Sequence, residues 1–164
     1  MIYAFNANEI LQMAIDVEEN GLVFYELAQE KVEEPEVKDI FRFLAGEERA
    51  HKKQFESLKA ALPESAKAET VWDPNDQMVQ YLQMMADLHV FGKAGVSEKY
   101  LEHVKSTEDA LNMAIQFEKD SIIFFLSLEE AVEDRQARLK VMDLINEERQ
   151  HIKKLALKLR QLRR

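Results

Sequence analysis

Two motifs of equal spacing combine a carboxylate with an imidazole. Glu48 lies three residues before His51, and Glu148 lies three residues before His151. If each motif is helical, its two side chains share one helix face, because residues three apart are neighbours there. Each motif could then offer an oxygen and a nitrogen to one metal ion, or to two adjacent ions. Such ligands suit iron, manganese or zinc, so the motifs indicate a metal site.

Both motifs belong to an internal repeat with an offset of 100 residues. The string Glu-Glu-Arg-x-His stands at 47–51 and again at 147–151. Other positions match at the same offset: 13–15 with 113–115, and Phe24 with Phe124. The repeat predicts two equivalent halves. We expect Glu47 and Glu147, which begin the string, to be partners of ligands or solvated charges, and not ligands themselves.

The repeat selects one further carboxylate in each half. Glu18 corresponds to Glu118, whereas the adjacent Glu19 corresponds to Lys119. The feature that the two halves share is therefore the first pair. We expect Glu19 to be an exposed surface charge.

Four long helices are expected to position these groups. Apolar residues recur at helical spacing over about 6–32, 35–62, 106–132 and 135–164. Pro35 suits the first turn of the second helix, and the break before it is short. The first two helices should therefore be antiparallel neighbours.

The connection between the halves, about 63–105, differs in character from the long helices. We expect a shorter helix within it, at about 75–91. The fold class that follows is all-α: two helical hairpins in pseudo-repeat, joined by a long crossover. We expect a single domain over 1–164, with repeat halves at about 6–62 and 106–160.

The inward stripe of each predicted helix is apolar except near its middle. The polar exceptions on the four helices are Glu18, Glu48, His51, Glu118, Glu148 and His151, with Tyr25 and Ser121 beside them. Four carboxylates in one core cannot all stay ionised without compensation, because removing each charged group from water costs on the order of several kcal/mol. Two divalent cations would neutralise all four charges. Without metal, we expect the clustered carboxylates to have raised pKa values in the fold.

Three neighbouring positions could shape the site. Gly21 and Ser121 are small, and we expect them to leave room for ions and an exogenous ligand. Tyr25 either donates a hydrogen bond to a ligand carboxylate or an oxygen species, or is simply a core residue. Its repeat partner is Phe125, so the hydroxyl is not needed on both sides.

Composition excludes several function classes. The chain has 22 Lys and Arg against 31 Asp and Glu, a net charge of −9, so we expect no nucleic-acid partner. The absence of cysteine excludes disulfides, thiolate metal sites and a thiol nucleophile. We expect no membrane association, because no apolar run approaches about 18 residues. We expect a cytoplasmic protein.

At these residues the chain resembles the ferritin-like di-iron carboxylate proteins, and most closely their rubrerythrin-like branch. Residues 14–25 look like the first-helix signature of that branch, and 48–51 and 148–151 look like its two Glu-x-x-His motifs. The resemblance spans about 6–62 and 106–160. It implies a ferritin-like four-helix bundle with a di-iron centre in its core.

The resemblance also implies a ligand set. Its members would be Glu18, Glu48, His51, Glu118, Glu148 and His151. Glu48 and Glu148 would bridge two iron ions, although manganese or zinc would also suit these ligands by type.

The function implied by the resemblance is redox chemistry with peroxide or dioxygen, as in a rubrerythrin-like peroxidase. Two alternatives stay open: a ferroxidase or iron-handling protein, and a metal-stabilised interaction module without turnover. The chain has no cysteine-ligated rubredoxin domain, so electrons would come from an external donor protein. Ser121 stands where rubrerythrins carry an additional carboxylate, which departs from the pattern of efficient peroxidases. We expect a homodimer.

Overall fold

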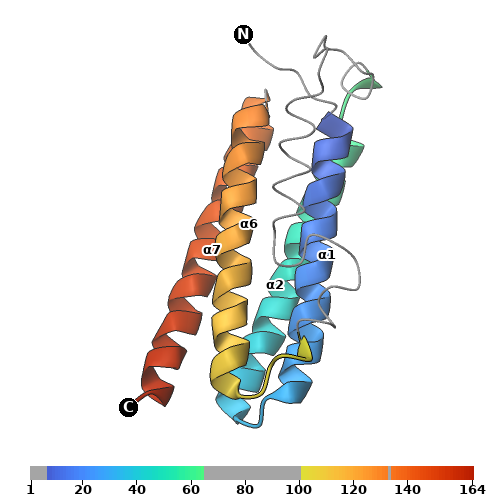
Figure 1. Ribbon diagram of the computed structural model, residues 1–164. Helices are drawn as coiled ribbons and strands as arrows, with labels where there is room; N and C mark the ends of the chain where they lie inside the picture. The colour runs from blue at the N-terminus through green and yellow to red at the C-terminus, as the bar shows by residue number, and fades with distance from the viewer. Residues whose placement is uncertain (1–6, 65–100, 133) are drawn as a thin grey trace.

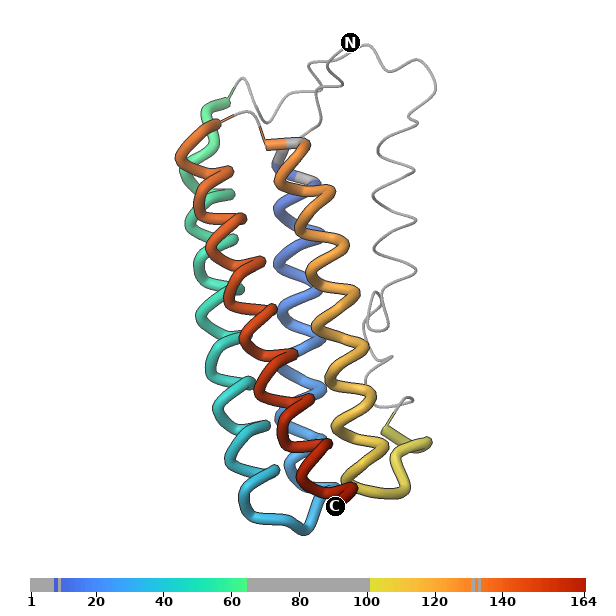
Figure 2. The backbone as a smooth tube through the Cα atoms, turned by 90° about the vertical axis from the view of Figure 1, so that its left-hand side faces the viewer, coloured from blue at the N-terminus to red at the C-terminus, as the bar shows by residue number. Residues whose placement is uncertain are grey.

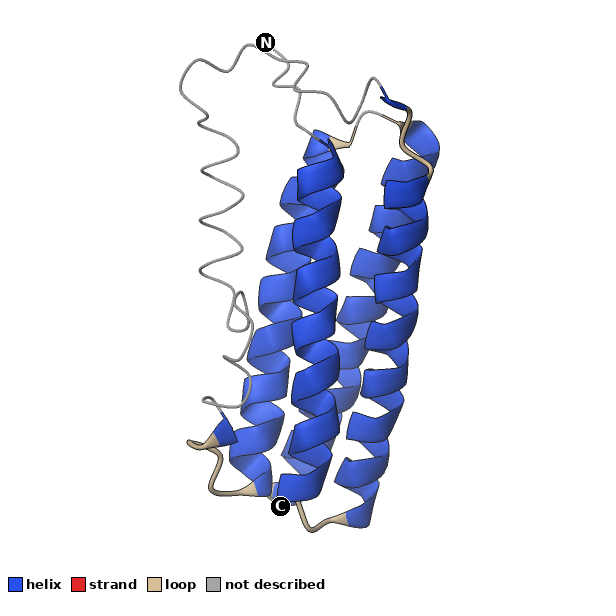
Figure 3. Ribbon diagram, turned by 90° about the vertical axis from the view of Figure 1, so that its right-hand side faces the viewer, coloured by secondary structure: helices blue, strands red, loops and turns tan. Residues whose placement is uncertain are grey.

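Four long helices make up almost all of the computed structural model, which describes residues 7–64, 101–132 and 134–164. They are α1 (Ala7–Lys31), α2 (Pro35–Ala60), α6 (Thr107–Ala131) and α7 (Arg135–Leu162). They pack side by side as a bundle (Figure 1). Within the described ranges there is no strand (Figure 3). The prediction of an all-α four-helix bundle is therefore confirmed.

Local sequence signals set the helix ends. Pro35 occupies the first turn of α2. The Ser106 hydroxyl accepts a hydrogen bond from the Asp109 amide at the start of α6, and the Asp134 carboxylate accepts one from the Ala137 amide at the start of α7. These caps satisfy amide groups that would otherwise lack partners in the first turn. The four helices end within two residues of the expected bounds.

The helices form two antiparallel hairpins, α1 with α2 and α6 with α7. Contacts within each hairpin are more extensive than those between hairpins, where α1 faces α6 and α2 faces α7. α2 ends and α6 begins at opposite ends of the bundle, as a long crossover requires (Figures 1 and 2). The expected short helix at about 75–91 lies outside the described residues.

A polar layer divides the core into two apolar clusters. One cluster includes Phe24, Phe41 and Phe117, and the other includes Phe55 and Phe124. Between the two clusters, each helix contributes buried polar residues, which are Glu18 and Asn20 on α1, Glu48 and His51 on α2, Glu118 and Ser121 on α6, and Glu148 and His151 on α7. No described helix has the length and apolar character needed to cross a membrane.

Candidate metal centre

All four helices contribute to one buried cluster of carboxylates and imidazoles. Its members are Glu18 from α1, Glu48 and His51 from α2, Glu118 from α6, and Glu148 and His151 from α7. Each of these side chains is nearly inaccessible to solvent. The structure therefore brings together the six residues that sequence and resemblance selected.

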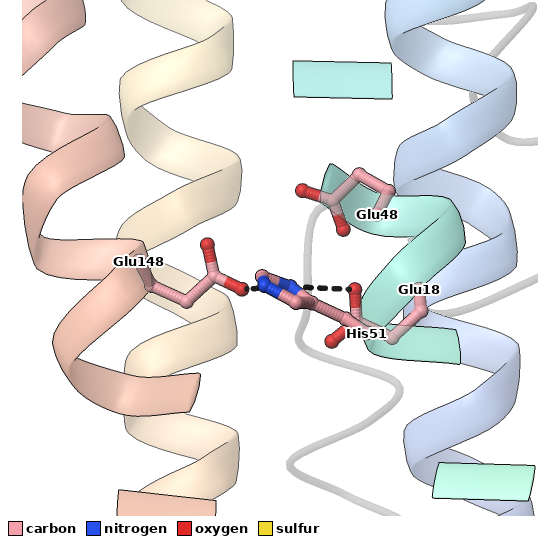
Figure 4. A group of neighbouring side chains, drawn as sticks. All are labelled: Glu18, Glu48, His51 and Glu148. Carbon is pink, nitrogen blue, oxygen red and sulfur yellow. Dashed lines mark ion pairs between the residues drawn. The ribbon is translucent and has the colours of Figure 1, made fainter. Parts of the chain in front are cut away.

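Ligand atoms in this cluster form two overlapping groups of four, each group lying within 4.8 Å. One group contains Glu18 and His51, the other contains Glu118 and His151, and Glu48 and Glu148 belong to both. Figure 4 shows the first group, with His51 between the carboxylates of Glu18 and Glu148. Two groups that share two carboxylates are the arrangement expected for two adjacent metal ions.

Several ligand atoms of the cluster have no hydrogen-bond partner although they are buried. They are both carboxylate oxygens of Glu18 and of Glu48, one oxygen each of Glu118 and Glu148, and Nδ1 of His51. A buried polar group without a partner costs about 1–3 kcal/mol, and more if it is charged. Metal coordination would satisfy such atoms, so the donor set and its unpaired oxygens fit two metal ions.

Both imidazoles present Nδ1 to the cluster. His51 Nδ1 lies 2.9 Å from Glu148 Oε1 and 3.6 Å from Glu18 Oε2. His151 Nδ1 lies 2.7 Å from Glu148 Oε2 and 3.6 Å from Glu118 Oε1. The two rings stack with centroids 5.8 Å apart. The Glu148 carboxylate thus contacts both imidazoles, as a shared ligand would.

Burial and crowding raise the pKa of two carboxyls. The pKa of Glu48 lies well above its ordinary value because of burial and of repulsion by Glu18 and Glu148. Burial and the charge of Glu148 likewise raise the pKa of Glu118 well above its ordinary value. These two carboxyls therefore resist ionisation when no metal ion is bound.

The two histidines balance the remaining charge. Burial opposes their protonation, but nearby carboxylates outweigh it and raise the pKa of His51 to about 12 and that of His151 to about 10. Burial opposes ionisation of Glu148, but its contacts with the imidazoles of His151 and His51 outweigh burial and lower its pKa. The expectation of raised carboxylate pKa values is therefore wrong for Glu148, because this carboxylate lies between the two protonated imidazoles.

Tyr25 is buried and donates a hydrogen bond to Glu118 Oε1 across the two hairpins. Burial and the charge of Glu118 raise the pKa of Tyr25 well above 10, so the phenol stays neutral and remains a donor. Phe125, at the repeated position, has no hydroxyl to offer. Glu118 is therefore held by a phenol, whereas neither oxygen of Glu18 has a hydrogen-bond partner.

The expectation that Gly21 leaves open space is wrong. A Cβ atom at this position would overlap the ring of Phe117 and lie 3.1 Å from Glu48 Oε2. Gly21 is small because the aromatic ring occupies the space beside it. Sequence reasoning did not single out Phe117, although a signal existed: the repeat pairs Gly21 and Phe117 with Ser121 and Val17, a complementary exchange of sizes.

The remaining acidic candidates lie around the cluster. Glu19 is half-exposed and forms an ion pair with Lys52 at 2.5 Å, so it is a surface charge as expected. The Glu147 carboxylate contacts His51, and the Glu47 carboxylate lies near His151.

The fold and this cluster define a class: ferritin-like four-helix bundles whose core holds a carboxylate and imidazole metal site. The Rubrerythrin family model matches residues 9–159, and the chain belongs to the rubrerythrin family. Family membership and the buried cluster are consistent with two iron ions.

A solved structure supports the fold. The chain is similar to a protein of Thermotoga maritima described as a ferritin-like diiron-carboxylate protein, with 23% sequence identity and a TM-score of 0.68. The similarity covers 98% of both chains. Comparison with curated proteins gave no match.

Proposed function

We propose that this protein is a di-iron oxidoreductase that reduces peroxide or dioxygen, in a rubrerythrin-like role. The observation that carries the proposal is the sharing of Glu48 and Glu148 by two groups of buried ligand atoms. A single cation would leave two of four buried carboxylates uncompensated, whereas two cations compensate all four. Family membership supports redox chemistry with oxygen species in general.

Each half of the bundle would supply one ion with its own ligands. Glu18 and His51 would hold the first, Glu118 and His151 would hold the second, and the two shared carboxylates would bridge them. When bound, a pair of ferrous ions supplies the two electrons that reduce one peroxide, with two protons, to two waters.

The surrounding residues would prepare the site for this chemistry. The apolar clusters above and below the polar layer exclude water, which strengthens electrostatic interactions inside it. The Phe117 ring packs against Gly21 beside Glu48. Tyr25 orients one oxygen of Glu118 through its neutral hydroxyl. These groups keep the ligand carboxylates in place before an oxidant binds.

Electrons for repeated turnover must come from outside the chain. It contains no cysteine, so it carries no thiolate-ligated iron of its own. We therefore include an external electron donor protein in the proposal, and a homodimer as the working assembly.

The proposal is tested by loading the protein anaerobically with two Fe(II) per chain and adding one equivalent of peroxide. We expect rapid consumption of one peroxide per two Fe(II), with a matching change in the ultraviolet–visible spectrum. Glu48→Ala should abolish the reaction, and Glu19→Ala should retain it. Peroxide consumption no faster than with the same amount of free Fe(II) would favour a metal-stabilised module. Oxidation by dioxygen that continues through repeated Fe(II) additions would favour iron handling.

A further inference from the structure

Two partly exposed carboxylates lie on the outer side of the histidines. Glu47 and Glu147 directly precede the shared carboxylates Glu48 and Glu148, so they share their helices but project to a different face. Their side chains are 35% and 46% exposed, whereas both shared carboxylates are buried. Neither belongs to the two groups of ligand atoms.

Each of these carboxylates faces an imidazole of the other hairpin. Glu147, on α7, accepts a hydrogen bond from His51 Nε2 on α2 at 2.9 Å. Glu47, on α2, lies with its Oε2 atom 3.8 Å from His151 Nε2 on α7. The contacts are thus exchanged across the α2–α7 boundary.

A surface ion pair does not account for these carboxylates. Among the described residues, neither forms an ion pair with a lysine or an arginine, and their charged partners are the two histidines. Glu26 provides the contrast: its side chain is also 46% exposed, but it pairs with Arg49 at 2.7 Å.

We propose that Glu47 and Glu147 are positioning residues for the metal centre, each orienting the imidazole that the opposite hairpin contributes. A carboxylate that accepts the Nε2 proton holds the ring in the tautomer whose Nδ1 lone pair faces the cluster. The exchange also means that each ion depends on both hairpins. This inference rests on the proposed function, because it presumes that the histidines bind metal.

The Glu147–His51 contact is closer than the Glu47–His151 contact. The His51 ring is held by a hydrogen bond, whereas the His151 ring lies beyond hydrogen-bond distance of Glu47. The His151 ring instead lies nearly perpendicular to the Phe43 ring, with centroids 6.3 Å apart, and Lys154 lies over the Phe43 ring. The position built on His51 therefore depends more on its outer carboxylate.

Anaerobic titration of the full chain with Co(II) tests the proposal, because its visible bands report ligand geometry without redox chemistry. We expect Glu147→Ala to weaken the binding of one ion by about 10–100-fold and to change its bands. Glu147→Gln should recover most of the affinity, because the amide oxygen still accepts the Nε2 proton. Glu47→Ala should have a smaller effect, and Glu26→Ala should match the unaltered protein.

The melting temperature of the metal-free proteins separates positioning from general stability. Without metal, Glu147→Ala should melt below Glu26→Ala, because it leaves Nε2 of the buried His51 without its partner, so Co(II) affinities are compared at a temperature at which every variant is folded. If the unaltered protein binds two Co(II) and Glu147→Ala binds them equally well, the positioning role is overturned while the proposed function stands. Equal losses in Glu147→Ala and Glu26→Ala would overturn it as well. An unaltered protein that binds no Co(II) would overturn both.

Discussion

The two halves of the bundle contribute matching ligands but surround them differently. In the half that contains Glu18, both carboxylate oxygens lack hydrogen-bond partners, and the neighbouring His51 ring is tied to Glu147 at 2.9 Å. In the other half, Glu118 accepts a hydrogen bond from Tyr25, and His151 is 3.8 Å from its outer carboxylate. In the first half, the imidazole Nε2 is hydrogen-bonded to an outer carboxylate; in the second half, the ligand carboxylate is hydrogen-bonded to a phenol.

This difference shows that the ligand positions of the repeat are restricted, whereas the residues around them can differ between the two halves. Charge neutrality restricts the cluster, because removing one buried carboxylate leaves two cations incompletely compensated. The surrounding positions are restricted only by local space and hydrogen bonding. Gly21 can therefore differ from Ser121, and Tyr25 from Phe125, while the ligands remain alike. Two ions in this site would consequently be inequivalent.

The largest expected effect comes from removing a ligand that both halves share. Glu48→Ala and Glu148→Ala should each abolish the two-ion site. The affinity for the second ion should fall by more than about 100-fold, which exceeds the loss expected when only the hydrogen-bond partner of a ligand is removed. Elemental analysis after anaerobic Fe(II) loading measures the stoichiometry. Glu19→Ala is the control and should bind two ions. Equal metal loss in Glu18→Ala and Glu19→Ala would contradict the assignment of the site.

Metal removal should have the next largest effect. Metal that binds only the native state adds about 4 kcal/mol to the free energy of unfolding when free metal is a thousandfold above Kd. For a chain of this size, that is a rise in melting temperature of about 10 °C. Calorimetry of metal-free and iron-loaded protein measures the difference. Identical melting temperatures would show that the six residues do not form one metal site.

Lowering the pH from 8 to 5 should stabilise the metal-free protein. His51 and His151 have pKa values of about 12 and about 10 in the fold, so above 6.5 the native state holds protons that the unfolded state releases. The raised pKa values of Glu48 and Glu118 act in the same direction down to about 4.5. By linkage, stability rises as the pH falls wherever the native state binds more protons than the unfolded state.

The gain should flatten below 6.5, where the unfolded histidines also bind protons. It should end near 4.5, where the lowered pKa of Glu148 begins to oppose it. Urea unfolding across this range measures the slope. Iron-loaded protein should not show the gain, because protons compete with the ions for the same atoms. A metal-free protein that loses stability from pH 8 to pH 5 would contradict the charge distribution.

Giving the first half the small residue of the second half should lower the free energy of unfolding by about 1–3 kcal/mol. Gly21→Ser would force a side chain into the space of the Phe117 ring, and overpacking of this kind is destabilising. Adding Phe117→Val, which copies the pair in the other half, should recover much of the loss. Urea denaturation of the single and double variants measures the coupling. Additive losses would show that the two residues do not share one space.

The smallest expected effect comes from replacing Tyr25 with phenylalanine, the residue at the repeated position 125. Tyr25→Phe removes one buried hydrogen bond to Glu118 and should cost about 1–2 kcal/mol of stability. Binding of the second Co(II) should weaken a few-fold, because Glu118 is no longer held. Chemical denaturation and Co(II) titration measure the two effects. Phe125→Leu, a core change without a hydroxyl, is the control, and it should leave the Co(II) spectrum unchanged.

The sequence alone determined the helices and the members of the cluster. Helical periodicity, Pro35 and Ser106 predicted the helix bounds, because these signals act within a few residues of the chain. The repeat identified Glu18 and Glu118 as equivalent and set Glu19 apart. The family resemblance then supplied iron and the assignment of bridging roles, which ligand type alone left open.

Only the tertiary structure decided which residues surround the cluster and how. That Tyr25 contacts Glu118 and Glu147 contacts His51 depends on how two hairpins pack, and each pair joins residues more than 90 positions apart. The sequence predicted open space at Gly21, whereas the ring of Phe117 occupies that space in the fold. Periodicity shows that a side chain points inward, but it does not show which atoms of another helix fill the space it faces. Packing between helices settles that, because the core is filled by side chains that meet only in the folded chain.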